Sequence, residues 1–286
     1  MDQVHGFLLE DLDIRGALVQ LGPSWAAIAA RRNYAAPVRD LLGELAAVTA
    51  LIGSNLKTPG RLSFQVQGHG PVSMLVMDCN EQLHLRGMAK SELAADAEAH
   101  IAGVADLLGD GRLVLTLQPQ SAQTPYQSVV PLVGSTLATI FEHYLAQSEQ
   151  QPARLWLAAT ADTACGLFLQ KLPGADLRDA DGWNRIETLA ATVRPEELAL
   201  PPEILLTRLF AEESVRLYPP RSAAWHCPRD EEKVRNMLLS LGREEVEAML
   251  ADAEAIAIED EICGHEYRFG PEIVDELFPP AGRILH

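Results

Sequence analysis

Residues 60–77 read GRLSFQVQGHGPVSMLVM, and this stretch decides the fold class. Leu62, Phe64 and Val66 alternate with polar residues, which is the period of a half-buried β-strand. The Gly-His-Gly-Pro sequence that follows turns the chain into a second apolar run. The stretch therefore predicts a β-hairpin.

Outward from the hairpin, the patterns predict more strands and few helices. Residues 37–52 repeat apolar side chains at three-to-four spacing, with Pro37 in a first turn, so they predict a helix. Strands that follow one another with few helices between them favour an α+β domain. The other elements predicted here are strands at residues 112–117, 154–158 and 166–172 and a helix at residues 132–147.

The character of the chain changes at about Asp179. Residues 182–193 and 202–215 are predicted to be helical, and prolines separate them. The second helix is amphipathic, and one side carries Leu205, Leu206, Leu209 and Phe210. Such a face most often belongs to a core, and a binding surface for other proteins is the alternative.

A small acidic part follows the predicted helices. It carries 15 Asp and Glu residues against 6 Lys and Arg residues from His226 onward. We expect helices at residues 230–242, 244–252 and 271–277 and paired strands at 256–260 and 266–269. The predicted layout is an α+β core domain (residues 1–178), a helical linker (179–224) and a small acidic domain (225–286).

Composition excludes several classes of protein. The chain has 286 residues, 48% hydrophobic residues and a net charge of −17, which disfavours nucleic acid and anionic membranes as partners. We find neither a basic signal-peptide start nor an apolar run of roughly 18 residues. Four cysteines fit a reducing cytosol, so a cytoplasmic protein is expected.

Several stretches resemble one family, the redox-regulated 33 kDa heat-shock chaperones. The linker carries LAATVRPEEL at residues 189–198 and LFAEE at 209–213. The resemblance covers nearly the whole chain in the right order. Its other parts are PYQSVVPL at residues 125–132, YLAQSEQ at 144–150, GLFLQ at 166–170, LLSLG at 238–242 and YRF at 267–269.

The resemblance implies an α+β core, a metastable helical linker and a small zinc-binding domain. It implies a chaperone that is inactive while reduced and zinc-bound. Oxidation in the family releases zinc, forms two disulfides and unfolds the linker, whose exposed apolar surface then holds unfolding proteins without ATP. Dimerisation accompanies activation.

The family's zinc ligands are only half present. The family has Cys-x-Cys and, some thirty residues later, Cys-x-x-Cys, which together form a closed tetrahedral site. Here the first motif reads Cys227-Pro-Arg229 and the second reads Asp260-Glu-Ile-Cys263. Arg229 cannot bind a cation, because its guanidinium stays protonated. Zinc binding is therefore doubtful or weak.

Three interpretations of this corner stay open. Cys227, Cys263, Asp260 and His265 form a rebuilt zinc site in the first. In the second, an Arg229–Asp260 ion pair and a Cys227–Cys263 disulfide replace the metal, since ligands of one zinc lie close together. In the third neither feature forms, and the flanking His226 and His265 are solvated.

The leading function is a holdase chaperone that binds unfolding proteins under oxidative or heat stress, and not an enzyme. One alternative is a thiol oxidoreductase, although the chain lacks the Cys-x-x-Cys pair that dithiol exchange uses. The other is a zinc-dependent interaction module. Cys79 and Cys165 adjoin apolar strands and are predicted to be buried.

Overall fold

The structure is a computed structural model that describes residues 2–279 apart from 57, 97–102, 123 and 252. It contains two compact units, Met1–His226 and Cys227–His286. Within the described residues, no helix combines the length and the apolar character needed to cross a membrane. Mixed helices and sheets confirm the predicted α+β class.

The first sheet of the larger unit holds six antiparallel strands in the order β10-β1-β2-β9-β8, and β11 pairs with β1 beside β10. Residues from both ends of the unit therefore meet in one sheet. Its strands are β1 (Gln3–Leu9), β2 (Ile14–Leu21), β8 (Ala153–Ala159), β9 (Ala164–Lys171), β10 (Val215–Leu217) and β11 (Arg221–Ser222).

The second sheet contains the hairpin predicted from residues 60–77. The hairpin strands pair in register from Leu62 with Cys79 to Gln67 with Met74. The sheet order is β12-β5-β4-β3-β6-β7. Its strands are β3 (Gly60–Gly68), β4 (Val72–Cys79), β5 (His84–Ser91), β6 (Gly111–Pro119), β7 (Tyr126–Pro131) and β12 (Ala224–Trp225).

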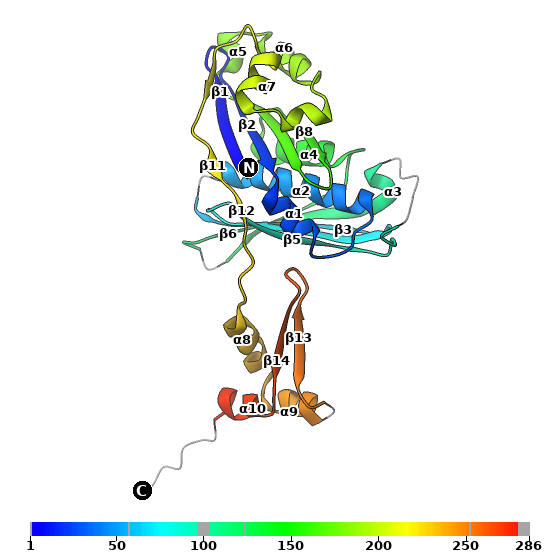
Figure 1. The fold of residues 1–286 in the computed structure, drawn as a ribbon. Helices are drawn as coiled ribbons and strands as arrows, with labels where there is room; N and C mark the ends of the chain where they lie inside the picture. The colour runs from blue at the N-terminus through cyan, green and yellow to red at the C-terminus, as the bar shows by residue number, and fades with distance from the viewer. Residues whose placement is uncertain (1, 57, 97–102, 123, 252, 280–286) are drawn as a thin grey trace. The chain divides into compact units, whose positions relative to one another are not determined.

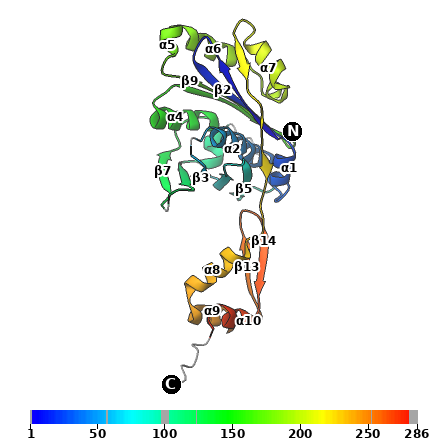
Figure 2. The same cartoon turned by 90° about the vertical axis from the view of Figure 1, so that its left-hand side faces the viewer.

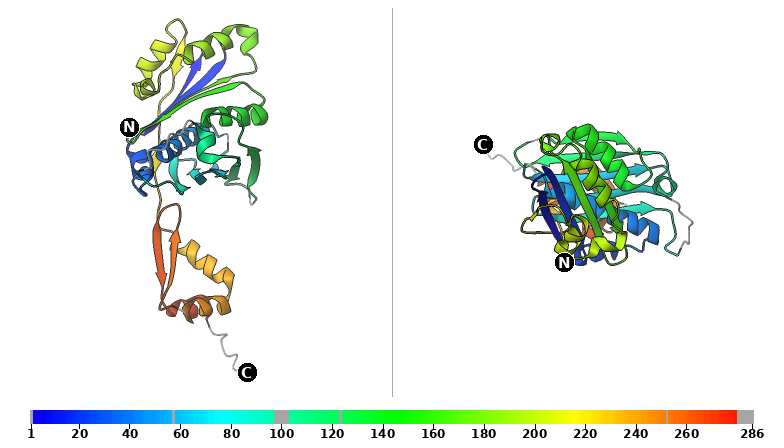
Figure 3. Two further views of the ribbon diagram at one scale, coloured as in Figure 1. Left: turned by 90° about the vertical axis from the view of Figure 1, so that its right-hand side faces the viewer. Right: turned by 90° about the horizontal axis from the view of Figure 1, so that it is seen from above.

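The helix α2 (Ala36–Ser54) runs between the two sheets, as Figures 1 and 3 show. It packs against strands of both sheets, and buried side chains point in nearly every direction around it. A helix that is apolar all round is expected in such a buried position. Three further helices of this unit are α1 (Pro23–Ala29), α3 (Val104–Leu108) and α4 (Leu137–Glu149).

The linker helices cover the opposite face of the first sheet, which we call the outer face (Figures 1 and 2). The side chains of this face include Phe7, Leu18, Leu167 and Leu169, and they form a hydrophobic cluster with the linker that is distinct from the α2 cluster. The short helix α5 (Ala175–Arg178) precedes the linker, whose elements are α6 (Gly182–Ala190), the 3₁₀ helix η1 (Pro195–Ala199) and α7 (Pro202–Leu209).

The linker is not helical throughout, which corrects the expected helix at residues 202–215. The helix α7 ends at Leu209, and the chain then runs extended as β10, β11 and β12. Tyr218-Pro-Pro at residues 218–220 cannot continue a helix, because two of its residues lack an amide proton. This extended run joins the edge of the first sheet to the edge of the second.

The described residues of the smaller unit form three helices and one antiparallel hairpin. Its own hydrophobic cluster includes Leu238, Val246, Tyr267 and Phe269. Asp230 caps the first helix by accepting a hydrogen bond from the amide of Lys233. The elements are α8 (Glu231–Leu241), α9 (Arg243–Ala251), β13 (Ile256–Asp260), β14 (His265–Phe269) and α10 (Glu272–Leu277).

Glu44 of α2 is a partly buried acid beside the linker. It lines a cavity of about 240 Å³ with residues of β8 and with Val193, Pro195 and Leu198 of the linker. Burial, and secondarily the charge of Asp40, raise the pKa of Glu44 to about 7. The folded protein therefore retains a proton that the unfolded chain has already released at mildly acidic pH.

We expect the stability of this unit to fall as pH rises from about 4.5 to 7, in so far as Glu44 contributes. Glu44→Gln should remove this dependence and stabilise the protein by about 1–3 kcal/mol at pH 8. Urea unfolding at pH 5 and pH 8 measures both effects, with Glu212→Gln at an exposed position after α7 as the control. Equal pH dependence in Glu44→Gln and wild type contradicts the prediction.

Candidate redox centre and linker-covered face

The turn between β13 and β14 positions Cys263. Asp260 and His265 pair across the hairpin at its last rung. The Asp260 carboxylate accepts hydrogen bonds from the amides of Ile262 and Cys263, at 2.9 and 3.2 Å. A carboxylate that binds amides two and three residues later holds a tight turn without a metal. Asp260 therefore orders the backbone that carries Cys263.

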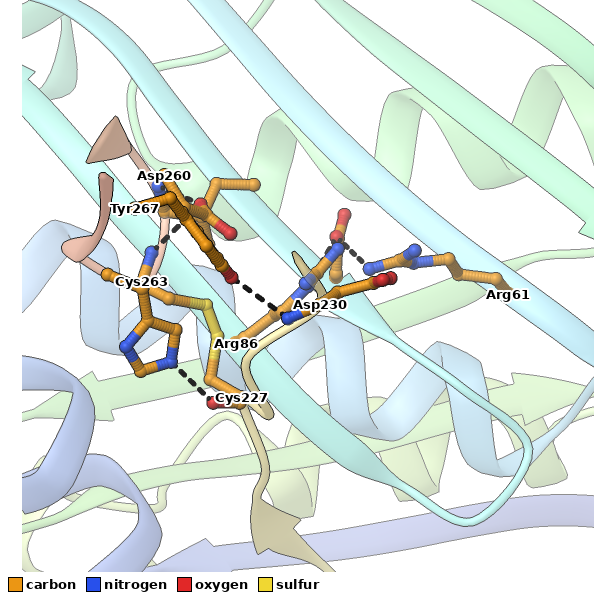
Figure 4. The surroundings of a disulfide bond; sticks show 10 residues. Arg61, Arg86, Cys227, Asp230, Asp260, Cys263 and Tyr267 are labelled. Carbon is orange, nitrogen blue, oxygen red and sulfur yellow. Dashed lines mark hydrogen bonds and ion pairs between the residues drawn. A yellow bond between two sulfur atoms is a disulfide. The ribbon is translucent and has the colours of Figure 1, made fainter. Parts of the chain in front are cut away.

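Cys227 and Cys263 form a disulfide (Figure 4). Their Cα atoms lie 6.1 Å apart, within the usual span of a disulfide. Both residues are buried, with exposed fractions of 8% and 2%. The bond links the start of the smaller unit to the tip of its hairpin, so it closes a loop across most of that unit.

His265 lies beside the disulfide. Its Nε2 is 2.8 Å from the backbone oxygen of Cys227. A carbonyl oxygen only accepts, so Nε2 carries the proton and the lone pair of a neutral ring is on Nδ1. Cys227, Cys263 and His265 offer ligand atoms that all lie within 4.8 Å of one another.

Asp260 and His226 are not part of this group of three. The Asp260 carboxylate is engaged by the turn amides. His226 belongs to the larger unit, where its amide donates to the oxygen of Leu85 and its ring lies 4.5 Å from that of His84. Among the described residues, the donor set is therefore two sulfurs and one imidazole.

The expected Arg229–Asp260 ion pair does not form in the structure. Arg229 donates to the backbone oxygen of Glu266, and its guanidinium lies 4.9 Å from the centre of the Tyr267 ring. The hydroxyl of Tyr267 in turn accepts from the amide of Asp230 (Figure 4). Arg229 thus joins the start of the smaller unit to β14 by a cation–π contact and not by a carboxylate.

The linker side chains singled out from the sequence come together on the outer face. Leu205, Leu206, Leu209 and Phe210 have exposed fractions of 1, 3, 8 and 1%. They pack with side chains of β1, β2 and β9, and the Phe210 and Phe7 ring centres lie 6.3 Å apart.

Polar contacts also attach the linker to the first sheet. The side chain of Gln20 donates to the backbone oxygens of Leu198 and Leu200, at 2.8 and 2.6 Å. Arg154 of β8 forms an ion pair with Glu187 of α6 at 2.6 Å. Gln20, Arg154 and Glu187 lie outside the motifs found in the sequence, and a lone Gln among apolar residues is the only local signal for Gln20.

The family model described as "Hsp33 protein" matches residues 2–270. The chain belongs to the Hsp33 family. It is 39% identical to a 33 kDa chaperonin of Methylobacillus flagellatus over 97% of this chain and 94% of that protein. It is 36% identical to a 33 kDa chaperonin of Vibrio cholerae over 100% of this chain and 99% of that one.

A solved structure supports the fold. The 33 kDa chaperonin of Thermotoga maritima superposes with a TM-score of 0.81 at 22% identity, over 97% of this chain and 98% of that one. Membership of the Hsp33 family makes this protein a chaperone. The family resemblance is therefore confirmed, although each of the two cysteine motifs keeps only one cysteine.

The remaining donors partly fit zinc. Two thiolates and an imidazole are zinc ligands, and the second nitrogen of His265 donates to a carbonyl as in many zinc sites. A closed structural site needs a fourth protein ligand, which this group does not provide. The sulfurs also have to be reduced, because thiolates bind the metal.

We expect reduced protein to hold less than one zinc per chain, or to lose it to mild chelation. A chelator dye titrated against reduced, zinc-loaded protein measures this, and His265→Ala should weaken the binding further. Cys79→Ser removes a thiol that lies outside the group and serves as the control. Stoichiometric zinc that resists the chelator would contradict a three-ligand site.

Proposed function

We propose that this chaperone is an ATP-independent holdase whose client-binding surface lies beneath the linker. The observation that carries the proposal is the separation of the two hydrophobic clusters on either side of the first sheet. Because α2 packs on the inner face, α6 and α7 can leave the outer face without dismantling the inner cluster. Their departure would expose the apolar side chains that unfolded proteins bind.

We also propose that the redox response differs from that of four-cysteine relatives. Two local disulfides cannot form here, because Arg229 and Asp260 occupy the partner positions. A single disulfide across the smaller unit constrains its unfolded state and so stabilises the unit. Oxidation would then tighten this unit, and reduction or heat would loosen it.

Chain continuity connects this change to the linker. Cys227 follows β12 and His226, and the amides of Ala224 and His226 donate hydrogen bonds to the backbone oxygens of Leu83 and Leu85. Loosening at Cys227 frees the end of the extended run that begins after α7. We therefore expect reduction to increase client binding.

The oxidoreductase alternative has less support from the geometry. The disulfide sulfurs belong to residues that are nearly inaccessible to a dithiol substrate. Burial raises the pKa of Cys79 to about 12 and that of Cys165 to about 11, so these thiols stay protonated and are poor nucleophiles at neutral pH.

The test is aggregation of a heat-unfolded client, followed by light scattering without ATP. We expect stoichiometric chaperone to suppress scattering, more strongly when it is reduced, and added ATP to change nothing. We further propose that the protein is cytoplasmic and that it is a homodimer in the active state. Its partners would be unfolded proteins, and it would bind neither nucleic acid nor membranes. Scattering that stays at the client-only level in both redox states would contradict the holdase proposal.

A further inference from the structure

A cavity of about 240 Å³ opens inside the larger unit, at the C-terminal end of α2. It lies on the inner face of the first sheet, away from the linker. Its wall is mostly apolar and includes Leu51, Leu56, Leu117, Leu145 and Phe168. Four polar side chains line it as well: Asn55 and Thr58 near the end of α2, and Arg15 of β2 and Gln170 of β9 on neighbouring strands.

Arg15 and Gln170 fix each other's orientation. Nε of Arg15 donates to Oε1 of Gln170 at 2.8 Å. A guanidinium has no acceptor, so the amide oxygen of Gln170 has to face it and the amide nitrogen has to point elsewhere. Gln170 is 2% exposed, and within the described part of the chain its side chain forms only this hydrogen bond. Because no fully buried side-chain nitrogen or oxygen there lacks a partner, the amide nitrogen keeps accessible surface. The cavity is the space left to that nitrogen.

The terminal nitrogens of Arg15 are also available. Within the described residues, no carboxylate forms an ion pair with Arg15, although the chain carries 40 acidic residues. Arg15 is not needed to cap α2 either. The last carbonyls of that helix accept hydrogen bonds from the Ser54 and Asn55 side chains, the amides of Asn55 and Leu56, and Arg221.

The cavity thus combines a positive, donor-rich end with an apolar body. A guanidinium and a primary amide present planar N–H donors, which match the two oxygens of a carboxylate. The remaining wall favours a hydrocarbon tail. The volume lies below the range of drug-sized ligand sites, which limits the tail to on the order of eight carbons.

We propose that this cavity binds a small amphiphilic carboxylate, a medium-chain fatty acid, with its carboxylate on Arg15 and Gln170 and its tail against α2 and α4. The site is separate from the linker-covered face and from the disulfide, so it does not depend on the proposed function. Octanoate is the probe.

The experiment is a calorimetric titration of the full chain with octanoate, with 1-octanol as a probe of equal tail length and no charge. We expect saturable octanoate binding and at least tenfold weaker octanol binding. Arg15→Met should weaken octanoate binding at least tenfold. Leu56→Trp, which fills the cavity and keeps Arg15, should abolish it.

Arg112→Met is the matched control. Arg112 also donates through Nε to a cross-strand glutamine, Gln67 at 2.6 Å, but it lies outside the cavity. This variant should bind octanoate like wild type. Thermal melts establish that each variant is folded, and octanoate should raise the melting temperature of wild type but not that of Leu56→Trp.

Any one of four results would overturn the proposal. One is that wild type binds no octanoate at concentrations up to about 10 mM, which is on the order of the dissociation constant of a weak ligand. Another is equal binding of octanoate and octanol, or equal octanoate affinity in wild type and folded Arg15→Met. The last is tighter binding of acetyl-Gly-Leu than of octanoate, which would assign the cavity to the C-terminal carboxylate of a protein.

Discussion

Phe210→Asp should release α7 from the outer face and make the chaperone bind clients without stress. Phe210 is 1% exposed and packs near Phe7. Truncation of a buried Phe alone costs about 3–5 kcal/mol, and a carboxylate placed there has no partner charge. The linker cluster should therefore open while the α2 cluster stays closed.

Hydrogen exchange of residues 202–209 and client light scattering measure the two halves of this prediction. Ile204→Asp is a matched control, because Ile204 lies on the same helix with 46% exposure and should tolerate the charge. Leu206→Ala is a milder variant that should shift both readouts in the same direction. Wild-type exchange together with wild-type client binding in Phe210→Asp would show that the linker is not the covering element.

Reduction of the Cys227–Cys263 disulfide should destabilise the smaller unit by about 3–4 kcal/mol, because the bond joins two residues that are 36 positions apart in the sequence and so closes a long loop. For a unit of this size, the melting temperature of its transition should fall by roughly 10 °C or more. Calorimetry of the full chain in oxidised and reduced form measures the difference. Client binding should rise in the reduced form.

Cys227→Ser should have the melting temperature and client binding of the reduced wild type, whether the variant is oxidised or reduced. Cys79→Ser changes a free, buried thiol of the other unit and should leave the redox difference intact. Peptide mapping of peroxide-treated protein should recover the Cys227–Cys263 pair. If oxidation instead lowers the melting temperature of the smaller unit and increases client binding, the proposed reversal of the redox response is wrong.

The spacing of apolar residues predicted those helices and strands in which it matches the buried side of the element. The hairpin at residues 60–77 and the helix at 37–52 appear as β3, β4 and α2. The strands β1 and β2 were missed, because both contribute buried side chains to the clusters on the two faces of the sheet and their apolar residues do not alternate regularly with polar ones. β7 was not predicted as a strand, and the helix expected from residue 132 begins only at Leu137, where Thr136 caps it.

The sequence predicted only part of the candidate site. The proximity of Cys227 and Cys263 follows from the family's ligand positions and agrees with the disulfide. The partners of Arg229 and Asp260 could not be derived in that way. A position that no longer binds a metal can take any local partner. Here the Asp260 carboxylate accepts from backbone amides, and the Arg229 guanidinium lies over the Tyr267 ring.

The most direct test of the account is hydrogen exchange of the chaperone while it holds a client. The central claim is that clients replace the linker on the outer face of the first sheet. Residues 202–209 should then exchange faster in the complex than in the free protein, while the amides of α2 keep their protection. Unchanged exchange at residues 202–209 in a client-saturated complex would contradict the claim.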